Sequence, residues 1–94
     1  MMSGAQPQGY HPDYAQLTAY LKRRRRRQIT LSFTELEQSI LLGPLPYGAR
    51  AQASWWSNTP SRMMHQNRGW LDAGWRVAAR DQLAETVTFE RSEG

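Results

Sequence analysis

Hydrophobic residues recur at helical spacing near the start of the chain. Beyond Pro12, the apolar positions fall three and four residues apart, at Tyr14, Leu17 and Leu21. This spacing places them on one face of an amphipathic helix, and proline suits the first position of such a helix. The pattern predicts a first helix of about three to four turns.

A second helix is predicted from Ser32 onward. Ser32 and Glu35 have the S-x-x-E spacing of a capping box, in which each side chain accepts a hydrogen bond from the other residue's backbone N–H. Leu31 and Leu36 stand at the positions of a hydrophobic staple around this box. We expect the helix to end at Gly43, because two prolines follow it.

The middle of the chain is less regular. Residues 48–54 are rich in alanine and predict a short helix. After a turn that contains a proline, the pattern predicts a longer helix over 62–73, which Gly74 ends. A glycine within a helix costs about 1 kcal/mol relative to alanine. Gly69 therefore indicates that a neighbouring element approaches the helix closely at this point.

Near the C-terminus the hydrophobic period changes to two. Trp75 and Val77 alternate with polar residues, and so do Val87 and Phe89 after a short polar stretch. Two such runs predict a β-hairpin. The segment 29–31 also favours β structure, and we expect it to be the third strand, because a lone hairpin is marginal in water.

The order of these elements predicts the fold class. We expect an α+β fold with three helices on a small antiparallel β-sheet that ends in a C-terminal hairpin, an arrangement like that of winged-helix domains. The predicted organisation is a single domain over residues 12–91, with disordered tails at 1–11 and 92–94.

The composition adds several exclusions. The chain has 94 residues and no cysteine, so it has room for one domain and contains neither disulfides nor thiolate metal sites. No apolar run approaches the ~20 residues that cross a bilayer, and the first residues lack the apolar stretch of a signal peptide. These features predict a soluble, cytoplasmic protein that does not bind membranes.

The charge is unevenly distributed. The net charge is +4, yet six consecutive cations occupy residues 22–27, and the segment 81–94 has four acidic residues and one arginine. Such asymmetry favours a polyanionic partner, and a polyanion would relieve the mutual repulsion of six adjacent cations. The alternative is a solvated helix end followed by a charged linker. The predicted phosphate contacts are Lys22, Arg23, Arg24, Arg25, Arg26 and Arg27, together with Arg76 and Arg80 on one face of the hairpin.

Base contacts are predicted mainly from the helix over 62–73. Its polar side carries residue types that form bidentate hydrogen bonds with base edges in the major groove. The candidates are Arg62, His65, Gln66 and Arg68, with Asn58 from the preceding turn. The alternatives are an ordinary polar helix face and, for Asn58, a side chain that binds the local backbone.

Three aromatic residues are candidates for stacking on a base or for anchoring a protein partner: Trp55, Trp56 and Tyr47. The two tryptophans are adjacent, so they cannot share one face of a helix or strand. We expect at least one of them to fill the core. Which of the two is exposed is left open.

Four stretches of the sequence resemble one family. They are "ITLSFTELEQ", "LGPLPYGARAQASWWSN", "NRGWLDAGWRV" and "ETVTFER". Their order and content are similar to an uncharacterised family of small bacterial and phage-borne domains with the pattern LPxSA, WWxN, AWLxAGW and VxFxR. The matching positions are Leu45, Pro46, Ala49, Trp55, Trp56, Asn58, Trp70, Leu71, Ala73, Gly74, Trp75, Val87, Phe89 and Arg91.

The chain departs from this pattern at two places. Tyr47 and Gly48 stand where a small polar residue is usual, and Gly69 stands where alanine is usual. The arginine run lies outside the pattern. The resemblance implies no activity, and it implies that any shared function involves the Trp-Trp-Asn region, which the arginines would strengthen or retarget.

Catalysis is not predicted. Of the two histidines, His11 lies in the predicted tail, and His65 and Asp72 are two helical turns apart, which is too far for a simple dyad. No residues have the spacing of metal ligands, and no glycine-rich loop would cradle a nucleotide. We expect no enzyme, no cofactor and no metal.

The leading hypothesis is a module that binds double-stranded DNA, as a small transcriptional regulator or nucleoid-associated protein and as a homodimer. RNA binding is a variant of it. The hypothesis from another class is a protein-interaction adaptor or inhibitor, which would use exposed tryptophan and tyrosine anchors beside the basic patch.

Overall fold

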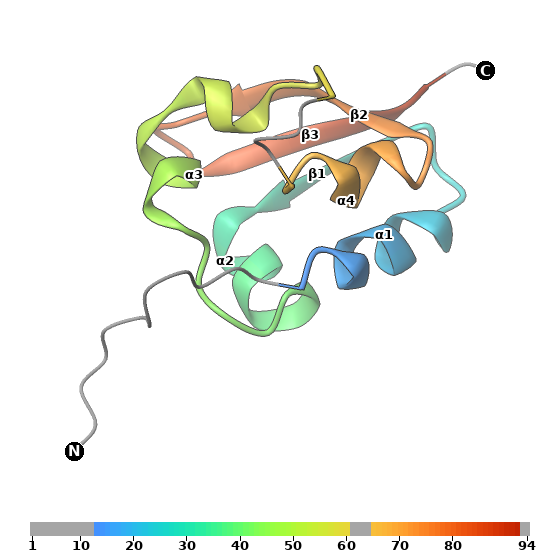
Figure 1. Cartoon of the computed structure of the whole chain (residues 1–94), viewed down its shortest axis with the longest axis horizontal. Helices are drawn as coiled ribbons and strands as arrows, with labels where there is room; N and C mark the ends of the chain where they lie inside the picture. Colours follow the sequence, from blue (N-terminus) through green and yellow to red (C-terminus); the bar gives the residue numbers. More distant parts are fainter. Residues whose placement is uncertain (1–12, 61–64, 93–94) are drawn as a thin grey trace.

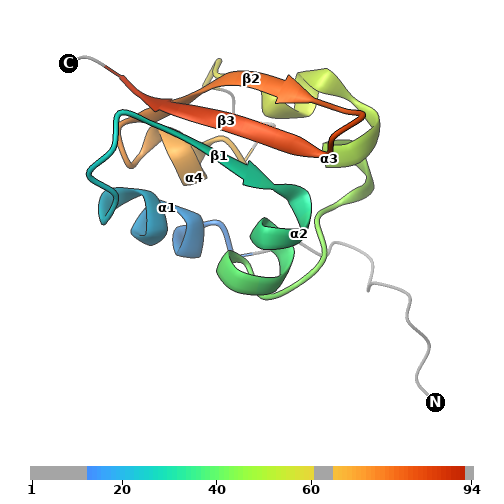
Figure 2. The same cartoon turned by 180° about the vertical axis from the view of Figure 1, so that it is seen from behind.

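The computed structural model describes residues 13–60 and 65–92, which form one layer of short helices against one face of a three-stranded antiparallel sheet (Figure 1). In chain order the elements are α1 (Ala15–Lys22), β1 (Gln28–Ser32), α2 (Phe33–Glu35), the π-helical turn η1 (Leu36–Ile40), α3 (Tyr47–Ala51), the 3-10 turn η2 (Ala53–Trp56), α4 (Arg68–Leu71), β2 (Trp75–Asp81) and β3 (Thr86–Arg91). Seen from behind, α4 lies on the far side of the sheet (Figure 2).

The sheet has the strand order β1-β3-β2. The predicted hairpin is confirmed, since β2 and β3 pair antiparallel. The predicted third strand is confirmed as well, since β1 pairs with β3 from Gln28 opposite Glu90 to Ser32 opposite Thr86. The α+β class with a small antiparallel sheet therefore holds.

The second helix begins as the capping box predicts. The N–H of Glu35 donates to Ser32 Oγ over 3.0 Å, and the N–H of Ser32 donates to Glu35 Oε1 over 2.9 Å. Leu31 and Leu36 are both buried, as the staple requires. The helix widens into η1 in its second half, and the left-handed residue beyond it is Leu42, with φ of 57°, in place of the expected Gly43.

The helical part differs from the prediction in two respects. The described residues contain four α-helices where the predicted fold class counts three, because the short helix predicted over 48–54 forms over 47–51 as α3 and adds a fourth. Residues 62–64 of the helix predicted over 62–73 lie outside the described part of the chain, and within 65–73 the helix is only α4 (Arg68–Leu71), with a turn before it. The physical reason is tertiary: the amide of Gln66 donates to the carbonyl of Trp55, and the amide of Asn67 donates to the carbonyls of two residues in the preceding turn. These hydrogen bonds hold residues 66 and 67 against the preceding segment of the chain, and the helix begins only after them.

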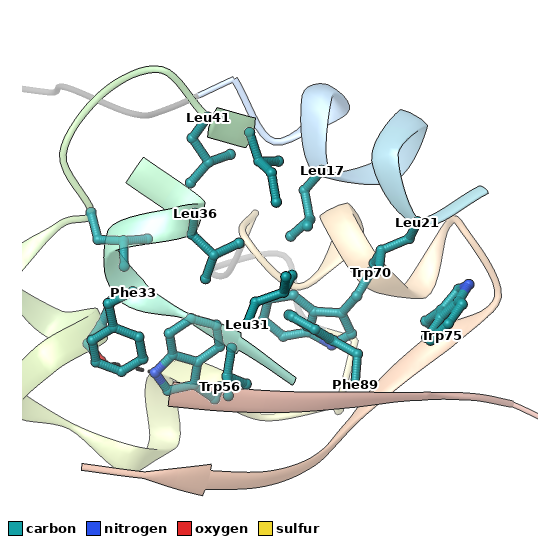
Figure 3. Packing of buried hydrophobic residues seen from close by; sticks show 14 residues of the cluster. Leu17, Leu21, Leu31, Phe33, Leu36, Leu41, Trp56, Trp70, Trp75 and Phe89 are labelled. Carbon is teal, nitrogen blue, oxygen red and sulfur yellow. Dashed lines mark hydrogen bonds between the residues drawn. The ribbon is translucent and has the colours of Figure 1, made fainter. Parts of the chain in front are cut away.

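The core lies between the helices and the sheet and is rich in aromatic rings (Figure 3). The Trp56 ring stacks on Phe33, with 5.5 Å between the ring centroids, and on Trp70, with 5.7 Å. Phe89 of β3 closes the group from the sheet side, 5.7 Å from the Trp70 ring. Stacked rings of this kind bind together more strongly than their buried area alone would give.

Gly69 permits the close packing of α4 on α1. A Cβ atom at this position would lie 3.2 Å from the backbone oxygen of Tyr14 and 3.2 Å from a methyl carbon of Leu17. The Thr18 hydroxyl donates to the Gly69 carbonyl over 2.8 Å and adds a polar contact at the same place. The predicted close approach of a neighbouring element is therefore confirmed, and that element is α1.

Candidate functional site

The arginine loop, residues 23–27, joins α1 to β1 at one end of the sheet (Figure 2). Its first part continues the helix, because the N–H of Arg24 donates to the Leu21 carbonyl over 3.0 Å. Its last residue leads directly into β1 at Gln28. A folded element therefore holds the loop on each side.

Arg91, at the end of β3, holds the backbone of this loop by donating hydrogen bonds to its carbonyls. Its backbone N–H donates to the Arg27 carbonyl over 2.8 Å, and its guanidinium Nε donates to the Arg26 carbonyl over 3.0 Å. The same guanidinium donates through Nη2 to the Arg24 carbonyl. The cation also lies over the Trp75 ring, 5.3 Å from its centroid. One side chain thus sets the course of the loop backbone.

The loop side chains fall into two groups. Arg24 turns inward, with its guanidinium 4.3 Å from the centroid of the Tyr20 ring, and its Nε is buried without a hydrogen-bond partner among the described residues. The side chains of Arg23, Arg25, Arg26 and Arg27 are exposed. These four cations, with the exposed Lys22 in the last turn of α1, form the accessible part of the predicted phosphate strip.

The two hairpin arginines do not belong to one surface, contrary to the prediction. A β-bulge shifts the register between Val77 and Ala79. Arg76, before the bulge, pairs opposite Glu90 on the face of the sheet away from the described helices, and its guanidinium donates to the Glu90 carboxylate. Arg80 pairs opposite the buried Val87 on the helix-covered face. Its Nη2 donates to the carbonyl of Arg50 over 3.0 Å.

Arg50, in α3, is tied to acidic groups. Its Nη2 donates to Glu37 Oε1 and its Nη1 to Glu85 Oε2, each over 2.9 Å. The hydrogen bond to Glu37, more than any other contact, raises the pKa of Arg50 above its ordinary value. Arg50 therefore contributes little positive field at the surface, unlike the loop arginines.

The residues predicted to contact bases lie in different environments. The Gln66 amide donates to the Trp55 carbonyl over 3.1 Å. His65 is exposed but precedes the helix, and Arg68 is exposed at its start. Arg62 lies outside the described residues. Of this group, Arg68 alone is both described on α4 and open to solvent.

Asn58 binds groups distant in the sequence and not only its local backbone, which the sequence did not predict. Its Oδ1 accepts hydrogen bonds from the backbone N–H of Val77 over 2.8 Å and from Trp70 Nε1 over 3.0 Å. Its Nδ2 donates to the Val77 carbonyl over 2.9 Å. The side chain thus pairs with the outer edge of β2 as another strand would. An amide engaged in this way is not free to contact a base.

The aromatic candidates separate clearly. Trp56 is 4% exposed, and its Nε1 donates to the Ala49 carbonyl over 2.8 Å, so it belongs to the core. Trp55 is half-buried, with its ring 6.1 Å from that of Tyr14 and 4.6 Å from that of Trp56. Tyr47 is 83% exposed at the start of α3. The expectation that at least one tryptophan fills the core is confirmed.

A groove of about 440 Å³ runs between α1 and α4. Lys22 of the last turn of α1 and Arg68 of α4 both line it, which brings together one residue from the predicted phosphate group and one from the predicted base group. Small residues, among them Ala15, Ala19 and Gly69, make up much of the remaining lining. The groove therefore begins where the arginine loop starts.

Neither a metal site nor a membrane span is found within residues 13–60 and 65–92. No three side chains of the histidine, cysteine, aspartate and glutamate types come together there. The helices of this part are too short and too polar to cross a bilayer.

Comparison with known protein families gives a match that covers most of the chain. The family model described as "Domain of unknown function (DUF7662)" covers residues 14–93. This agrees with the expectation of an uncharacterised family. No curated protein and no solved structure matches the chain.

Proposed function

Since the chain belongs to a family of domains of unknown function, DUF7662, we propose from its geometry that it is a DNA-binding module that contacts phosphates without reading base sequence. The observation that carries this proposal is the arginine loop, whose backbone is fixed by three hydrogen bonds from Arg91. A fixed loop presents its cations without first having to be ordered, so less conformational entropy is lost on binding.

The electrostatics favour a polyanion. Lys22, Arg23, Arg25 and Arg26 are exposed, and within the described part of the chain none of them has a carboxylate within ion-pair distance. If these four cations neutralise four phosphates, the slope of log K against log salt is about −3.6 for duplex DNA and about −2.8 for a single strand.

We propose no base-specific contacts because the amide side chains that could form them are already hydrogen-bonded within the fold. The side chains of Asn58 and Gln66 are bonded within the fold, and Asn67 is 1% exposed. A helix of four residues, α4, also offers little surface to a major groove. Contacts of this kind fit a nucleoid-associated protein better than a regulator of one operator.

We include the winged-helix-like arrangement in this proposal as the scaffold. The strand order β1-β3-β2 and the placement of β1 between the first two helices support it. The hairpin tip is a poor DNA contact, because Glu85 lies there and Asp81 and Thr86 pair at the end of the sheet away from the arginine loop. The proposed binding surface is therefore the loop and not the wing.

Titration of labelled DNA at several salt concentrations tests the proposal. Arg23, Arg25 and Arg26 replaced together by alanine should reduce affinity for all sequences alike and make the salt slope less negative by about 2 to 3. A control variant carries Thr34→Glu, Gln38→Glu and Gln52→Glu. It changes the net charge by the same −3 at exposed positions outside the loop.

The control separates local contacts from overall charge. We expect it to keep most of the salt slope. Equal losses of DNA affinity in the triple alanine variant and in the control would contradict the proposal, and so would the absence of DNA binding by the wild type at low salt. Competition with RNA of matched length then determines the preferred nucleic acid.

A protein-interaction module is the second candidate, and the exposure of Tyr47 favours it. Leu42 and Leu83 are also strongly exposed, at 74% and 98%, and exposed large side chains of this kind anchor partners. Trp56 is excluded as an anchor by its burial. Under this alternative, Tyr47→Ala would abolish capture of a partner protein and leave DNA binding unchanged.

A further inference from the structure

The groove between α1 and α4 has features that phosphate binding by the arginine loop does not explain. Apolar atoms make up most of its lining, with the small side chains of Ala15 and Ala19 along α1. Lys22 lies in the same lining, seven residues beyond Ala15, or about 10 Å along the helix. The groove therefore extends from the start of the arginine loop along one face of α1.

We propose that this groove binds a single-stranded segment of nucleic acid, which continues from the arginine loop past Lys22. This inference rests on the proposed function and names its ligand: a strand with unpaired bases. Its phosphates contact Lys22 and Arg68, and the faces of one or two bases lie against the small residues of α1.

The form of the groove favours a single strand over a duplex. The hydrogen bond from Thr18 Oγ1 to the Gly69 carbonyl shows that α1 and α4 are in direct contact, so the groove is an open hollow on their outer surface. A duplex presents its backbone and groove edges to such a hollow, whereas a single strand can lay base faces on its apolar floor.

The chemistry of the lining fits a nucleotide. Bases carry apolar faces that a single strand leaves open, whereas a duplex hides them in the stack. The groove offers apolar contact to those faces and cations to the phosphates. Asp72, also in the lining, would repel a phosphate, but its carboxylate accepts hydrogen bonds from the amino and ring N–H groups of bases.

The rigidity of the groove also suits a ligand that must be held against its walls. Tyr14, at one end, has its ring 6.1 Å from that of Trp55 and its backbone oxygen against Gly69. The walls are thus fixed by the core before any strand binds, so ordering them costs little on association.

Fluorescence anisotropy with labelled DNA tests the inference, using a single strand of about 12 nucleotides and a duplex of the same length. Ala19→Phe fills the groove at an exposed helix position without changing charge, and Ala51→Phe is the matched control on α3. We expect Ala19→Phe to weaken single-strand binding by about five-fold or more. The control should leave it unchanged, and neither variant should alter duplex binding.

A second pair of variants tests the same groove through charge. Arg68→Ala removes a lining cation, and Arg76→Ala removes an exposed arginine from the opposite face of the sheet. Arg68→Ala should make the salt slope for the single strand less negative by about 0.7, the value for one phosphate. Arg76→Ala should change it less.

The outcomes separate this inference from the proposed function. Loss of single-strand affinity in Ala19→Phe and Arg68→Ala, with both controls intact, supports it. If wild-type protein binds DNA through the arginine loop but these two variants bind the single strand like wild type, the groove is not the site. If duplex binds more tightly than single strand at equal phosphate concentration, the ligand class is wrong. If wild type binds neither form, the proposed function itself fails.

Discussion

Arg91 Nε donates to the backbone carbonyl of Arg26 over 3.0 Å and so ties the last strand to a loop 65 residues earlier in the chain. The same side chain bonds the Arg24 carbonyl, and both acceptors belong to the loop with the highest charge density of the molecule. Two of the five guanidinium N–H groups of Arg91 are used on these carbonyls, so this side chain determines where the neighbouring arginines point.

We predict that Arg91→Lys loosens the arginine loop although it keeps the charge. A lysine ammonium cannot reproduce the planar guanidinium that bonds two carbonyls at once. Amide hydrogen exchange across residues 24–28 should accelerate, and the free energy of unfolding should fall by about 1 kcal/mol. Affinity for DNA should fall with unchanged net charge. Arg76→Lys, in an exposed ion pair, is the control and should show neither effect.

Asn58→Ala should destabilise the fold strongly. It removes the partners of the Val77 N–H, the Val77 carbonyl and the Trp70 indole N–H. Each partly buried group left unpaired costs about 1–3 kcal/mol, so we expect a loss of about 3 kcal/mol or more in urea unfolding. The exposed Thr34→Ala should change stability by less than about 0.5 kcal/mol. A small loss of unfolding free energy in Asn58→Ala would contradict this prediction and would show that water replaces the amide.

Trp56→Ala should cost about 3–5 kcal/mol, as expected for an aromatic residue removed from a packed core. Trp56 is 4% exposed and stacks between Phe33 and Trp70. Tyr47→Ala, at an 83% exposed position, should leave the unfolding midpoint nearly unchanged. Chemical denaturation followed by circular dichroism measures both. Equal stability of the two variants would contradict the assignment of Trp56 to the core.

Gly69→Ala should separate α1 from α4. The added methyl would lie 3.2 Å from the Tyr14 backbone oxygen, tighter than ordinary contact, so the helices must move apart by a few tenths of an ångström. We expect a loss of about 1–2 kcal/mol and shifts of the α1 amide resonances in NMR spectra. Gly74→Ala has open space around its Cβ but a φ of +83°. It should lose about 1 kcal/mol without moving α1.

The fold was largely predictable where its signals are local. Ser32 and Glu35 define a helix start through a spacing of three residues, and the period of two at β2 and β3 defines a hairpin. The membership of β1 in the sheet followed from the instability of a lone hairpin, whereas its pairing with β3 is seen only in the structure. The length of α4 was not predictable, because Gln66 and Asn67 bond carbonyls that only the folded chain brings near.

The candidate site was predictable only in part for the same reason. Six adjacent cations are visible in any sequence, and the folded elements on both sides were expected. The opposite orientation of Arg76 and Arg80 was hidden, since a β-bulge leaves the alternation of residue types intact. From the sequence, Arg91 was identified only as a position that matches the family pattern. Its local signal, a cation at the end of the last strand beside the buried Trp75, does not reveal carbonyls 65 residues away.

The amide of Asn58 has a consequence for how copies of this protein can associate. By occupying both the N–H and the carbonyl of Val77, it blocks the β2 border of the sheet at this residue against strands from another molecule. Strand addition is therefore favoured at the β1 border. Growth of a fibril by this route uses both borders of each subunit, so the block at Val77 opposes polymerisation.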